Sequence, residues 1–389
     1  MSRSEKRVYL EAIRRRYRRA NVLKKTQILD EFCAVCRYNR KYAIRILGKR
    51  PKTHRAKPGR QSRYNTDKII SPLKMIWLAS NQMCSKKLKV ILREWLPHYE
   101  KENGLLDDVT RGQLYAISAA TIDRVLKPMR VAYPHKGLSG TRPGRLLKNQ
   151  IPIKTDNWDV TQPGFLEADT VAHCGNSLAG SFVWSLTLTD ILTTWTECRA
   201  TWNKGATGVL AKIKDVEQTL PFDILGYDCD NGTEFLNHHL IKYLHKREKP
   251  VQFTRSRAYH KNDNAHVEQK NWTHVRHLFG YDRFDNPELV NLMNDLYKHE
   301  WSLYQNYFCP TMKLIEKKKI NSRYYKRYDK PMTPYLRLIT SPHIQQDVKD
   351  RLREQHKQLN PFELKRIIEQ KLKQIFKLVP VTSNVRQRL

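Results

Sequence analysis

The pattern of apolar and polar positions changes character near Phe165. Before that point, apolar residues recur every three or four positions, which predicts amphipathic helices. Val8, Leu10, Ile13 and Tyr17 form the first such stripe. After it, short runs rich in Thr, Val, Trp and Leu are separated by Gly, Asn and Asp, which predicts strands. The chain is therefore predicted to join a helical part to a layered α/β part.

The predicted strands after Phe165 are interleaved with helices in a fixed order. "FLEADTVAH", "SFVWSLTLTD" and "LTTWTECRAT" are predicted as three strands, followed by the helix "NKGATGVLAKIKDVEQTL". A strand ending in "FDILGYDC", the helix "TEFLNHHLIKYLHKR", the strand "PVQFT" and the helix "NAHVEQKNWTHVRHLF" complete the series. This order predicts an α/β domain with a mixed sheet, in which the first strand is central and the fourth lies beside it.

The first 48 residues are predicted to form helices with a break at 37–39, where Asn39 is expected to cap the helix that follows. On that helix we expect two sets of side chains, Arg40, Lys41 and Arg45 outward and Tyr42, Ile44 and Leu47 inward. This is the shape of a helix-turn-helix unit, whose second helix enters a DNA major groove. A three-helix bundle with a solvated basic face fits the same pattern.

Segments rich in Gly, Pro and basic residues divide the rest of the chain. The predicted divisions are a helix-turn-helix DNA-binding unit (1–48), a basic linker (49–64), a second helical, helix-turn-helix-like DNA-binding unit (65–131), a basic linker (132–164), the α/β domain (165–285), a helical and basic C-terminal DNA-binding region (286–343) and an amphipathic helical tail (344–389). Ser118 is expected to cap a helix in the second unit. The tail carries the stripe Ile367, Ile368, Leu372, Ile375 and Phe376, which requires a partner surface in this chain or in another copy.

The net charge of +34, from 72 Lys and Arg against 38 Asp and Glu, indicates a polyanionic partner, most commonly nucleic acid. A membrane surface is disfavoured, because the mean hydropathy is −0.70 and the basic residues are spread along the whole chain. The N-terminal residues show no secretory signal pattern, and the 7 scattered Cys indicate a reducing compartment. A cytoplasmic, nucleoid-associated location is expected if the host is a prokaryote. The pair Cys33 and Cys36 is interpreted as helix packing, because no second pair stands at zinc-finger spacing.

Three acids far apart in the sequence fall at corresponding places in this pattern. Asp169 lies in the first predicted strand, Asp230 ends the fourth directly before Asn231 and Gly232, and Glu268 lies in the first turn of the last helix. In this strand order the first and fourth strands bring their ends together, and the last helix packs across the same edge. We therefore expect the three carboxylates to meet at one site.

Carboxylates in such a group suit the chemistry of phosphodiester bonds. An oxygen nucleophile must attack a phosphorus atom that is shielded by negative charge. Two Mg²⁺ ions about 4 Å apart activate the nucleophile and stabilise the leaving oxygen. Mg²⁺ takes hard oxygen ligands and keeps several waters, so a few Asp and Glu residues suffice, whereas Cys or His would select softer metals.

The stretches "LEADTV", "YDCDNGTEF" and "RAYHKNDNAHVEQKN" resemble the catalytic core of the DDE transposases and retroviral integrases, which have a ribonuclease-H-like fold. The resemblance covers residues 165–285. The 37 residues between Asp230 and Glu268 slightly exceed the usual spacing in that family, and Cys229 replaces its usual small or hydroxyl residue.

The resemblance implies that Asp169, Asp230 and Glu268 are catalytic metal ligands for two Mg²⁺ ions, with Mn²⁺ able to substitute. It implies an insertion-sequence transposase that cleaves the ends of a DNA element and joins the exposed 3′-hydroxyls to target DNA. Double-stranded DNA, as element ends and as target, would be the partner of a homo-multimer. Asp228 is interpreted as a helper or a strand-end capping acid.

Residues near the three acids, together with the basic helix of the first unit, are predicted to contact DNA. These are Arg40, Lys41, Arg45, Arg255, Arg257, His260, Lys261, Asn264, Lys270 and Asn271. Trp184 and Trp195 are interpreted as core residues of the sheet instead.

Two other functions share these features. A hydrolytic nuclease of the same superfamily would use the same acids, but it has little need for two helix-turn-helix units. A transposase-derived regulator would bind DNA without cutting it, and the loss of one acid would have indicated it. Because all three acids are present, the sequence favours the transposase.

Overall fold

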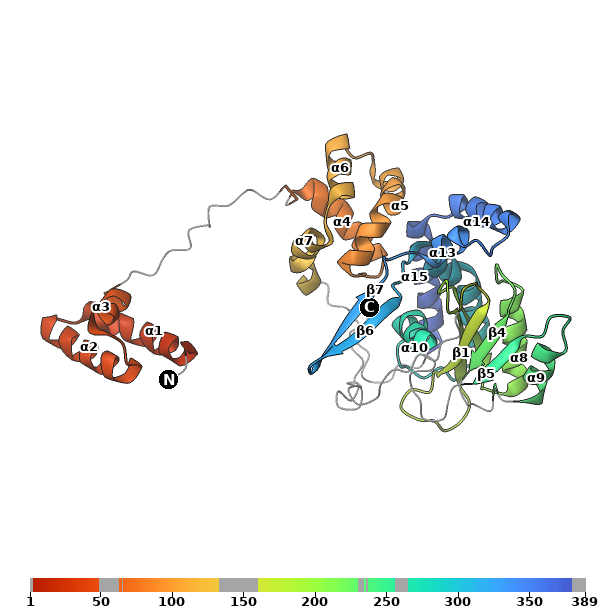
Figure 1. Ribbon diagram of the computed structural model, residues 1–389, viewed down its shortest axis with the longest axis horizontal. Helices are drawn as coiled ribbons and strands as arrows, with labels where there is room; N and C mark the ends of the chain where they lie inside the picture. The colour runs from red at the N-terminus through yellow and green to blue at the C-terminus, as the bar shows by residue number, and fades with distance from the viewer. Residues whose placement is uncertain are drawn as a thin grey trace. The chain divides into compact units, whose positions relative to one another are not determined.

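The computed structural model describes residues 3–48, 63–64, 66–132, 160–229, 234–235, 237–255 and 265–379. The chain divides into two compact units, Met1–Ser62 and Arg63–Leu389 (Figure 1). The boundary falls inside the predicted basic linker 49–64. None of the described helices is both long enough and apolar enough to span a membrane.

The first unit consists of three helices, α1 (Arg3–Arg19), α2 (Val22–Cys36) and α3 (Arg40–Gly48). Arg37 adopts a left-handed conformation with φ 53°, which ends α2. The Oδ1 atom of Asn39 accepts a hydrogen bond from the Lys41 N–H at 3.0 Å. The predicted break and the predicted cap of the second helix are therefore confirmed.

The core of this unit corrects part of the predicted inward set. Leu47 is fully buried, but Tyr42 and Ile44 are 40% and 45% exposed. Ala43, four positions before Leu47, takes the inward place, because residues four apart share one face of a helix. In α1, Ile13 is buried as expected, whereas Val8 is 71% exposed. Of the two cysteines on α2, Cys36 is buried among these side chains and Cys33 is half-buried.

The second unit contains a five-stranded sheet in the order β3-β2-β1-β4-β5. The strands are β1 (Phe165–Ala172), β2 (Val183–Asp190), β3 (Thr196–Trp202), β4 (Gly226–Cys229) and β5 (Gln252–Arg255). β1, β2 and β3 are antiparallel neighbours, whereas β4 runs parallel to both β1 and β5. The predicted mixed sheet, its central first strand and the adjacent fourth strand are all confirmed. A mixed sheet of this order, with helices around it, fits a ribonuclease-H-like core.

Helices cover both faces of this sheet. On one face, α8 (Ala206–Glu217) and α9 (His238–His245) bury Leu166 and Ala168 of β1 in one apolar cluster. On the other face lies a continuous helical segment made of α10 (Ala265–Lys270), the π-helical η2 (Asn271–Arg276) and α11 (His277–Phe279), which contacts β1 and β2. Alternate residues of β1 therefore face opposite layers, with Glu167, Asp169 and Val171 toward α10 and η2.

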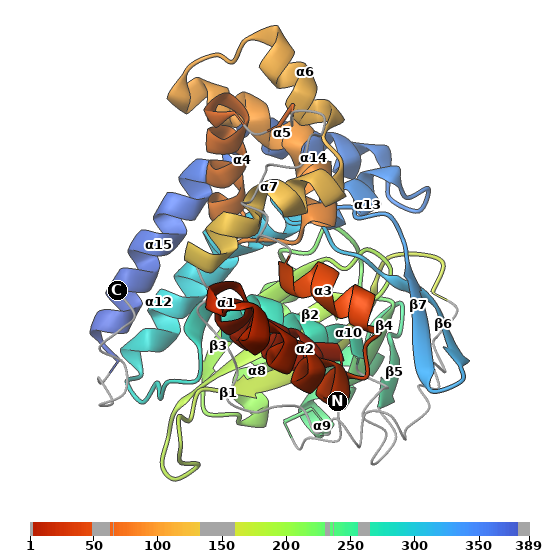
Figure 2. The ribbon, with the colours of Figure 1, turned by 90° about the vertical axis from the view of Figure 1, so that its left-hand side faces the viewer.

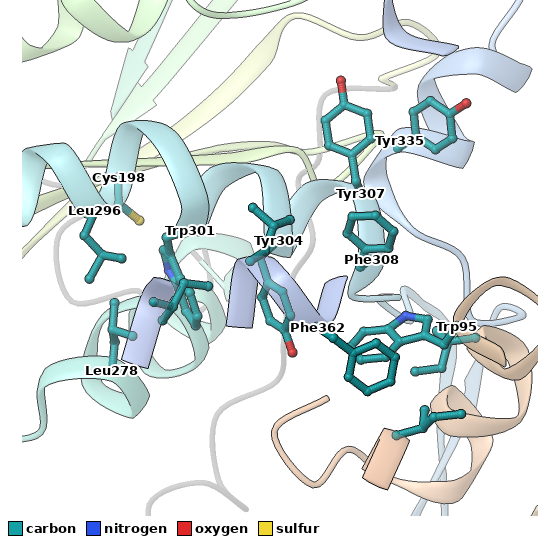
Figure 3. Close-up of a cluster of buried hydrophobic side chains, with 14 of the residues drawn as sticks. Trp95, Cys198, Leu278, Leu296, Trp301, Tyr304, Tyr307, Phe308, Tyr335 and Phe362 are labelled. Carbon is teal, nitrogen blue, oxygen red and sulfur yellow. The ribbon is translucent and has the colours of Figure 1, made fainter. Parts of the chain in front are cut away.

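A second apolar cluster joins helices that the predicted divisions assigned to separate regions. It contains α4 (Asp67–Ala79), α5 (Ser85–Asn103), α6 (Asp108–Ala116) and α7 (Ala119–Ala132), together with α12 (Glu288–Leu296), η3 (Tyr297–Trp301), η4 (Tyr304–Phe308), α13 (Pro334–Thr340), α14 (Gln346–Gln358) and α15 (Pro361–Lys377). In Figure 3, Trp95 of α5 lies among Tyr304, Phe308 and Phe362, with ring centroids 6.2, 6.3 and 5.3 Å away. Ser118 caps α7 as predicted, through a 3.1 Å bond to the Thr121 N–H.

The apolar stripe of the tail lies on α15 and packs against other helices of the same chain. Figure 2 shows α15 lying alongside α12, and α15 also contacts α4 and α5. Ile368 and Ile375 are buried there, Ile367 and Leu372 are half-buried, and Phe376 stays exposed. The stripe therefore closes the core of its own unit.

A two-stranded hairpin, β6 (Leu314–Ile320) and β7 (Arg323–Tyr328), occupies the basic region for which the sequence predicted no strands. Asn321, with φ 55°, begins the two-residue connection. Asn is a common residue at positive φ in such tight hairpin turns, and this was the signal that the sequence analysis missed.

Replacing Ile368 by Ala is expected to destabilise the second unit by about 2–5 kcal/mol, because a fully buried side chain would leave a cavity. All 8 Trp lie after residue 63, so urea unfolding followed by tryptophan fluorescence reports this unit. Lys373→Ala, on an exposed position of the same helix, serves as the control and should change stability by less than about 0.5 kcal/mol. Equal effects of the two variants would contradict the packing of α15.

Candidate functional site

The parallel pairing of β1 and β4 determines which residues stand side by side at the sheet edge. Ala168 of β1 is the register partner of Cys229, the last residue of β4. Asp169 directly follows the first of these residues, and Asp230 directly follows the second. Asp230 itself lies outside the described residues, as do Arg257, His260, Lys261 and Asn264. The described strands thus bring together the two positions from which the predicted acids follow.

Asp169 is half-buried and is held from two sides. Its Oδ1 accepts the Thr170 N–H at 2.7 Å, and its Oδ2 accepts the side-chain amide of Asn271 at 2.6 Å. Asn271 is the first residue of η2, and π-helical turns are frequent at functional sites. The sequence predicted that Asn271 contacts phosphate, whereas in the structure its amide is directed at the carboxylate. This bond fixes the helical segment against β1 beside Asp169.

Glu268 lies on α10, three residues before Asn271. Residues three apart lie on the same side of a helix, so Glu268 projects from the side of the segment that meets Asp169. Its side chain is exposed. The structure therefore places Asp169 on the first strand and Glu268 on the helical segment that is bonded to that strand.

Glu167 is a site residue that the sequence analysis did not identify. It shares a strand face with Asp169, is only 3% exposed, and accepts the Val267 N–H through Oε2 at 2.9 Å. The first N–H groups of a helix have no partner within the helix, so a carboxylate at this place stabilises the helix start. Glu167 thereby fixes the first turn of α10, which bears Glu268. The available signal was a second acid two residues before Asp169, and therefore on the same face.

Glu234 is a second buried acid that was missed, four residues after Asp230 in "DNGTEF". Its Oε1 accepts hydrogen bonds from the Thr170 hydroxyl at 3.1 Å and from the Lys204 Nζ at 3.4 Å. Its Oε2 is buried without a hydrogen-bond partner among the described residues. Because Thr170 is adjacent to Asp169, Glu234 ties the chain beyond Asp230 to β1 on the opposite face of the strand.

Asp228 lies on β4, where its register partner on β1 is Glu167. Its Oδ1 accepts the hydroxyl of Thr254 on β5 at 2.7 Å. This bond links two neighbouring strands close to their ends, and the interpretation of Asp228 as a helper or a strand-end capping acid stays a prediction.

Lys270, one of the residues predicted to contact DNA, is buried in the structure. It is only 5% exposed, and its Nζ donates to the Thr194 carbonyl at 3.1 Å in the turn between β2 and β3. Burial, and then the nearby Lys87, lower the pKa of Lys270 to about 7. The ammonium faces the protein interior, so Lys270 anchors the end of α10 and does not meet phosphate there.

The remaining residues, which were predicted to contact DNA or to lie in the core, differ in their exposure and contacts. In α3, Arg40 is ion-paired with Asp30, and Lys41 and Arg45 are exposed, as a DNA-facing helix requires. Arg255 lies at the end of β5, and its side chain is outside the described part of the structure. Trp195 is buried as expected, and Trp184 is half-buried beneath the Lys204 ammonium, 4.9 Å from its ring centre.

The donor chemistry of this edge fits a hard divalent cation. Asp169 and Glu268 supply carboxylate oxygens, the ligand type that Mg²⁺ prefers. Within the described ranges, no three Asp, Glu, His or Cys side chains gather closely enough to hold a metal ion, and Asp230 lies outside those ranges. The described residues alone therefore do not make up a metal site.

No protein-family model matches the chain. Among curated proteins, the uncharacterized protein y4rM of Sinorhizobium fredii (strain NBRC 101917 / NGR234) is 40% identical over 334 residues. The match covers 84% of this chain and 93% of that protein.

Solved structures similar to this chain include retroviral integrase cores. The HTLV-2 integrase catalytic core domain in complex with magnesium has a TM-score of 0.28 and 12% identity, over 38% of this chain and 90% of its own. The catalytic core domain of BIV integrase has a TM-score of 0.27 and 15% identity, over 44% of this chain and 91% of its own. The fold of the chain is defined by the strand order and the register of its sheet.

Replacing Lys270 by Met is expected to change how stability depends on pH. The pKa of Lys270 is about 7 in the folded chain and returns to about 10.4 on unfolding. Between these values the unfolded chain binds a proton that the folded chain does not bind. Wild-type stability relative to Lys270→Met should therefore rise with pH, by about 1.4 kcal/mol per unit, from about pH 7 toward pH 10.

Urea unfolding at several pH values between these limits measures this difference for each variant. Lys373→Met removes an exposed lysine from the same unit and serves as the matched control for the substitution itself. A flat difference for Lys270→Met would show that Lys270 is not held in the interior.

Proposed function

The chain belongs to the same family as y4rM of Sinorhizobium fredii, and we propose that it is a DNA transposase of the DDE type. In this proposal it binds the ends of a DNA element, cleaves them to expose 3′-hydroxyls, and joins these to target DNA. Because y4rM is uncharacterized, the proposal rests on the arrangement of the candidate site.

One observation carries the proposal, the convergence of three separate elements at one sheet edge. β1 and β4 pair at Ala168 and Cys229, and the helical segment is bonded to β1 through Asn271 and Asp169. Each of these elements bears or directly precedes one of the three predicted acids. A structural role for any single acid would not require the other two at the same edge.

In the proposed site, Asp169, Asp230 and Glu268 would hold two Mg²⁺ ions, with Mn²⁺ as a substitute. When bound, the ions would activate the attacking oxygen and stabilise the leaving oxygen. The protein would hold the three carboxylates in position. Asn271 orients the Asp169 carboxylate by a neutral hydrogen bond, which leaves its negative charge in place.

The charge of the chain supports DNA as the substrate. With a net charge of +34, the protein attracts phosphate polymers strongly at physiological salt. We propose that the helical units, α1–α3 and α4–α7, recognise the element ends. Two ends must be joined in one event, so a multimer on DNA is part of the proposal.

Replacing Glu268 by Gln is expected to reduce metal-dependent cleavage and joining by at least about 100-fold while leaving DNA binding intact, since a neutral amide is a poor ligand for Mg²⁺. Labelled duplexes that carry the repeats flanking the gene, a target plasmid and Mg²⁺ or Mn²⁺ form the assay. Glu288→Gln is the matched control, because Glu288 is also an exposed acid in the first turn of its helix. Asp230→Asn and Asp169→Asn should behave like Glu268→Gln.

The products of this assay separate the possible functions. Joined products that require metal and disappear in Glu268→Gln support the transposase. Metal-dependent cleavage without joining would replace it by a hydrolytic nuclease. Binding without any cleavage, equal in wild type and variant, would leave a DNA-binding regulator.

Glu167→Ala is expected to reduce the same activity by about 10- to 100-fold, because it removes the acceptor that fixes the first turn of α10. Glu167→Gln keeps an oxygen acceptor and should recover part of this loss. The rate should be measured against Mn²⁺ concentration, since a misplaced Glu268 raises the concentration of metal required. An unchanged metal requirement, with a uniformly lower rate and lower stability, would show that Glu167 has only a structural role.

A further inference from the structure

The β6–β7 hairpin has two chemically different faces. Directly opposed residues of an antiparallel pair share a face, so the register places Lys317 with Lys326 and Lys319 with Tyr324 on one face. We call these four residues the lysine face. The opposite face carries Glu316, Lys318, Arg323, Tyr325 and Arg327, and is called the glutamate face.

Side-chain contacts confirm this division. The ammonium groups of Lys317 and Lys319 lie 4.5 and 5.9 Å from the ring centre of Tyr324. On the glutamate face, Glu316 forms ion pairs of 2.6 Å with Lys318 and 3.3 Å with Arg327. Lys318 and Arg327 of the glutamate face thus share a carboxylate, whereas the two described strands place no acid on the lysine face.

The lysine face contains an unfavourable interaction. Lys317 and Lys326 are directly opposed across the two strands, and like charges at such positions destabilise a sheet. Partial burial, and then the charge of Lys326, lower the pKa of Lys317. A bound anion would relieve the repulsion between the two lysines.

Within the described part of the chain, hydrogen bonds anchor the hairpin at its base. Lys313 donates its N–H to Asp329 Oδ1 at 2.6 Å and its Nζ to the Leu192 carbonyl at 3.0 Å. The Thr311 hydroxyl lies 2.7 Å from that of Thr194, whose carbonyl accepts the Lys270 Nζ. One turn, between β2 and β3, therefore holds both the base of the hairpin and the helix that bears Glu268.

Beyond this base the two strands, of 7 and 6 residues, extend as a ribbon about 20 Å long (Figures 1 and 2). The major groove of B-DNA is about 12 Å wide and admits a two-stranded ribbon. The size and the charge of the hairpin therefore match a duplex.

We propose that the lysine face of the β6–β7 hairpin is a binding surface for double-stranded DNA, which it holds by phosphate contacts without reading the base sequence. The choice of DNA as partner rests on the proposed function. The three lysines contact phosphates, and Tyr324 supports two of their ammonium groups. The shared anchor at Thr194 keeps the ribbon, and the DNA on it, in a fixed relation to the helix that bears Glu268.

Two triple variants of the full chain test this proposal, Lys317→Ala/Lys319→Ala/Lys326→Ala and Lys318→Ala/Arg323→Ala/Arg327→Ala. Each removes three positive charges from one face, so their effects on overall charge are equal. Binding to two labelled duplexes of unrelated sequence is measured by fluorescence anisotropy over a range of salt concentrations. EDTA is present throughout, so that metal-dependent catalysis plays no part.

Each phosphate contact contributes about 0.9 to the slope of log affinity against log salt concentration. The lysine-face variant is expected to lower this slope by about 2 to 3 on both duplexes, and the glutamate-face variant by less than about 1. Equal slopes for the two variants would overturn the proposal. A loss confined to one duplex would also overturn it, because it would indicate sequence reading.

A further variant, Lys326→Glu, separates the loss of DNA contacts from a loss of binding that is caused by unfolding of the hairpin. It creates an opposed Lys–Glu pair with Lys317, which should preserve or raise the melting temperature while still weakening DNA binding. Loss of binding only together with a lower melting temperature would contradict the proposal. Anionic phosphatidylserine vesicles are tested in parallel, and a lysine-face defect seen with vesicles but not with DNA would assign the face to a membrane instead.

These outcomes are independent of catalysis. If strand joining is demonstrated but the two triple variants bind DNA with equal slopes, the hairpin proposal fails and the proposed function stands. If catalysis is absent but the slopes differ as expected, the hairpin proposal stands and the proposed function fails.

Discussion

The parallel register of β1 against β4 is the constraint on which the site depends. Phe165 pairs with Gly226 and Ala168 pairs with Cys229, so Asp169 of β1 comes directly after a residue that is paired with the last residue of β4. Side chains alternate along a strand, so a slip of one residue would turn Asp169 toward α8 and α9. The apolar residues prevent such a slip, because Leu166, Ala168 and Cys229 are buried on that side. Packing on one face of the sheet thereby fixes the chemistry on the other.

Buried acids near this edge maintain the arrangement. A buried carboxylate is costly unless hydrogen bonds replace its water. Glu167 receives a helix N–H, and Glu234 receives a hydroxyl and an ammonium group. The bonds of Val267 to Glu167 and of Thr170 to Glu234 each join β1 to a segment that is distant in sequence. The same acids therefore hold these elements together.

The sequence predicted best those features that depend on local pattern. The strand order and the caps at Asn39 and Ser118 followed from periodicity and spacing. It failed where tertiary packing decides. Lysine is usually a surface residue, yet Lys270 is buried beside the β2–β3 turn. Tyr42 and Ile44 have largely apolar side chains, but they face outward on a short helix. The hairpin was missed because charged residues and a tyrosine lie on each of its faces, so no apolar face marked it as a sheet.

A protein that acts on DNA phosphates has two electrostatic requirements that oppose each other. Phosphate must be attracted over a wide surface, yet the reacting group requires carboxylates to hold metal ions. Under the proposed function these two requirements would be met in separate places, with lysines on the ribbon and acids at the sheet edge. The two sites would have to act on one DNA molecule, and this requires a rigid connection between them. Thr194 supplies it, because this single residue bonds to Lys270 behind Glu268 and to Thr311 at the base of the ribbon.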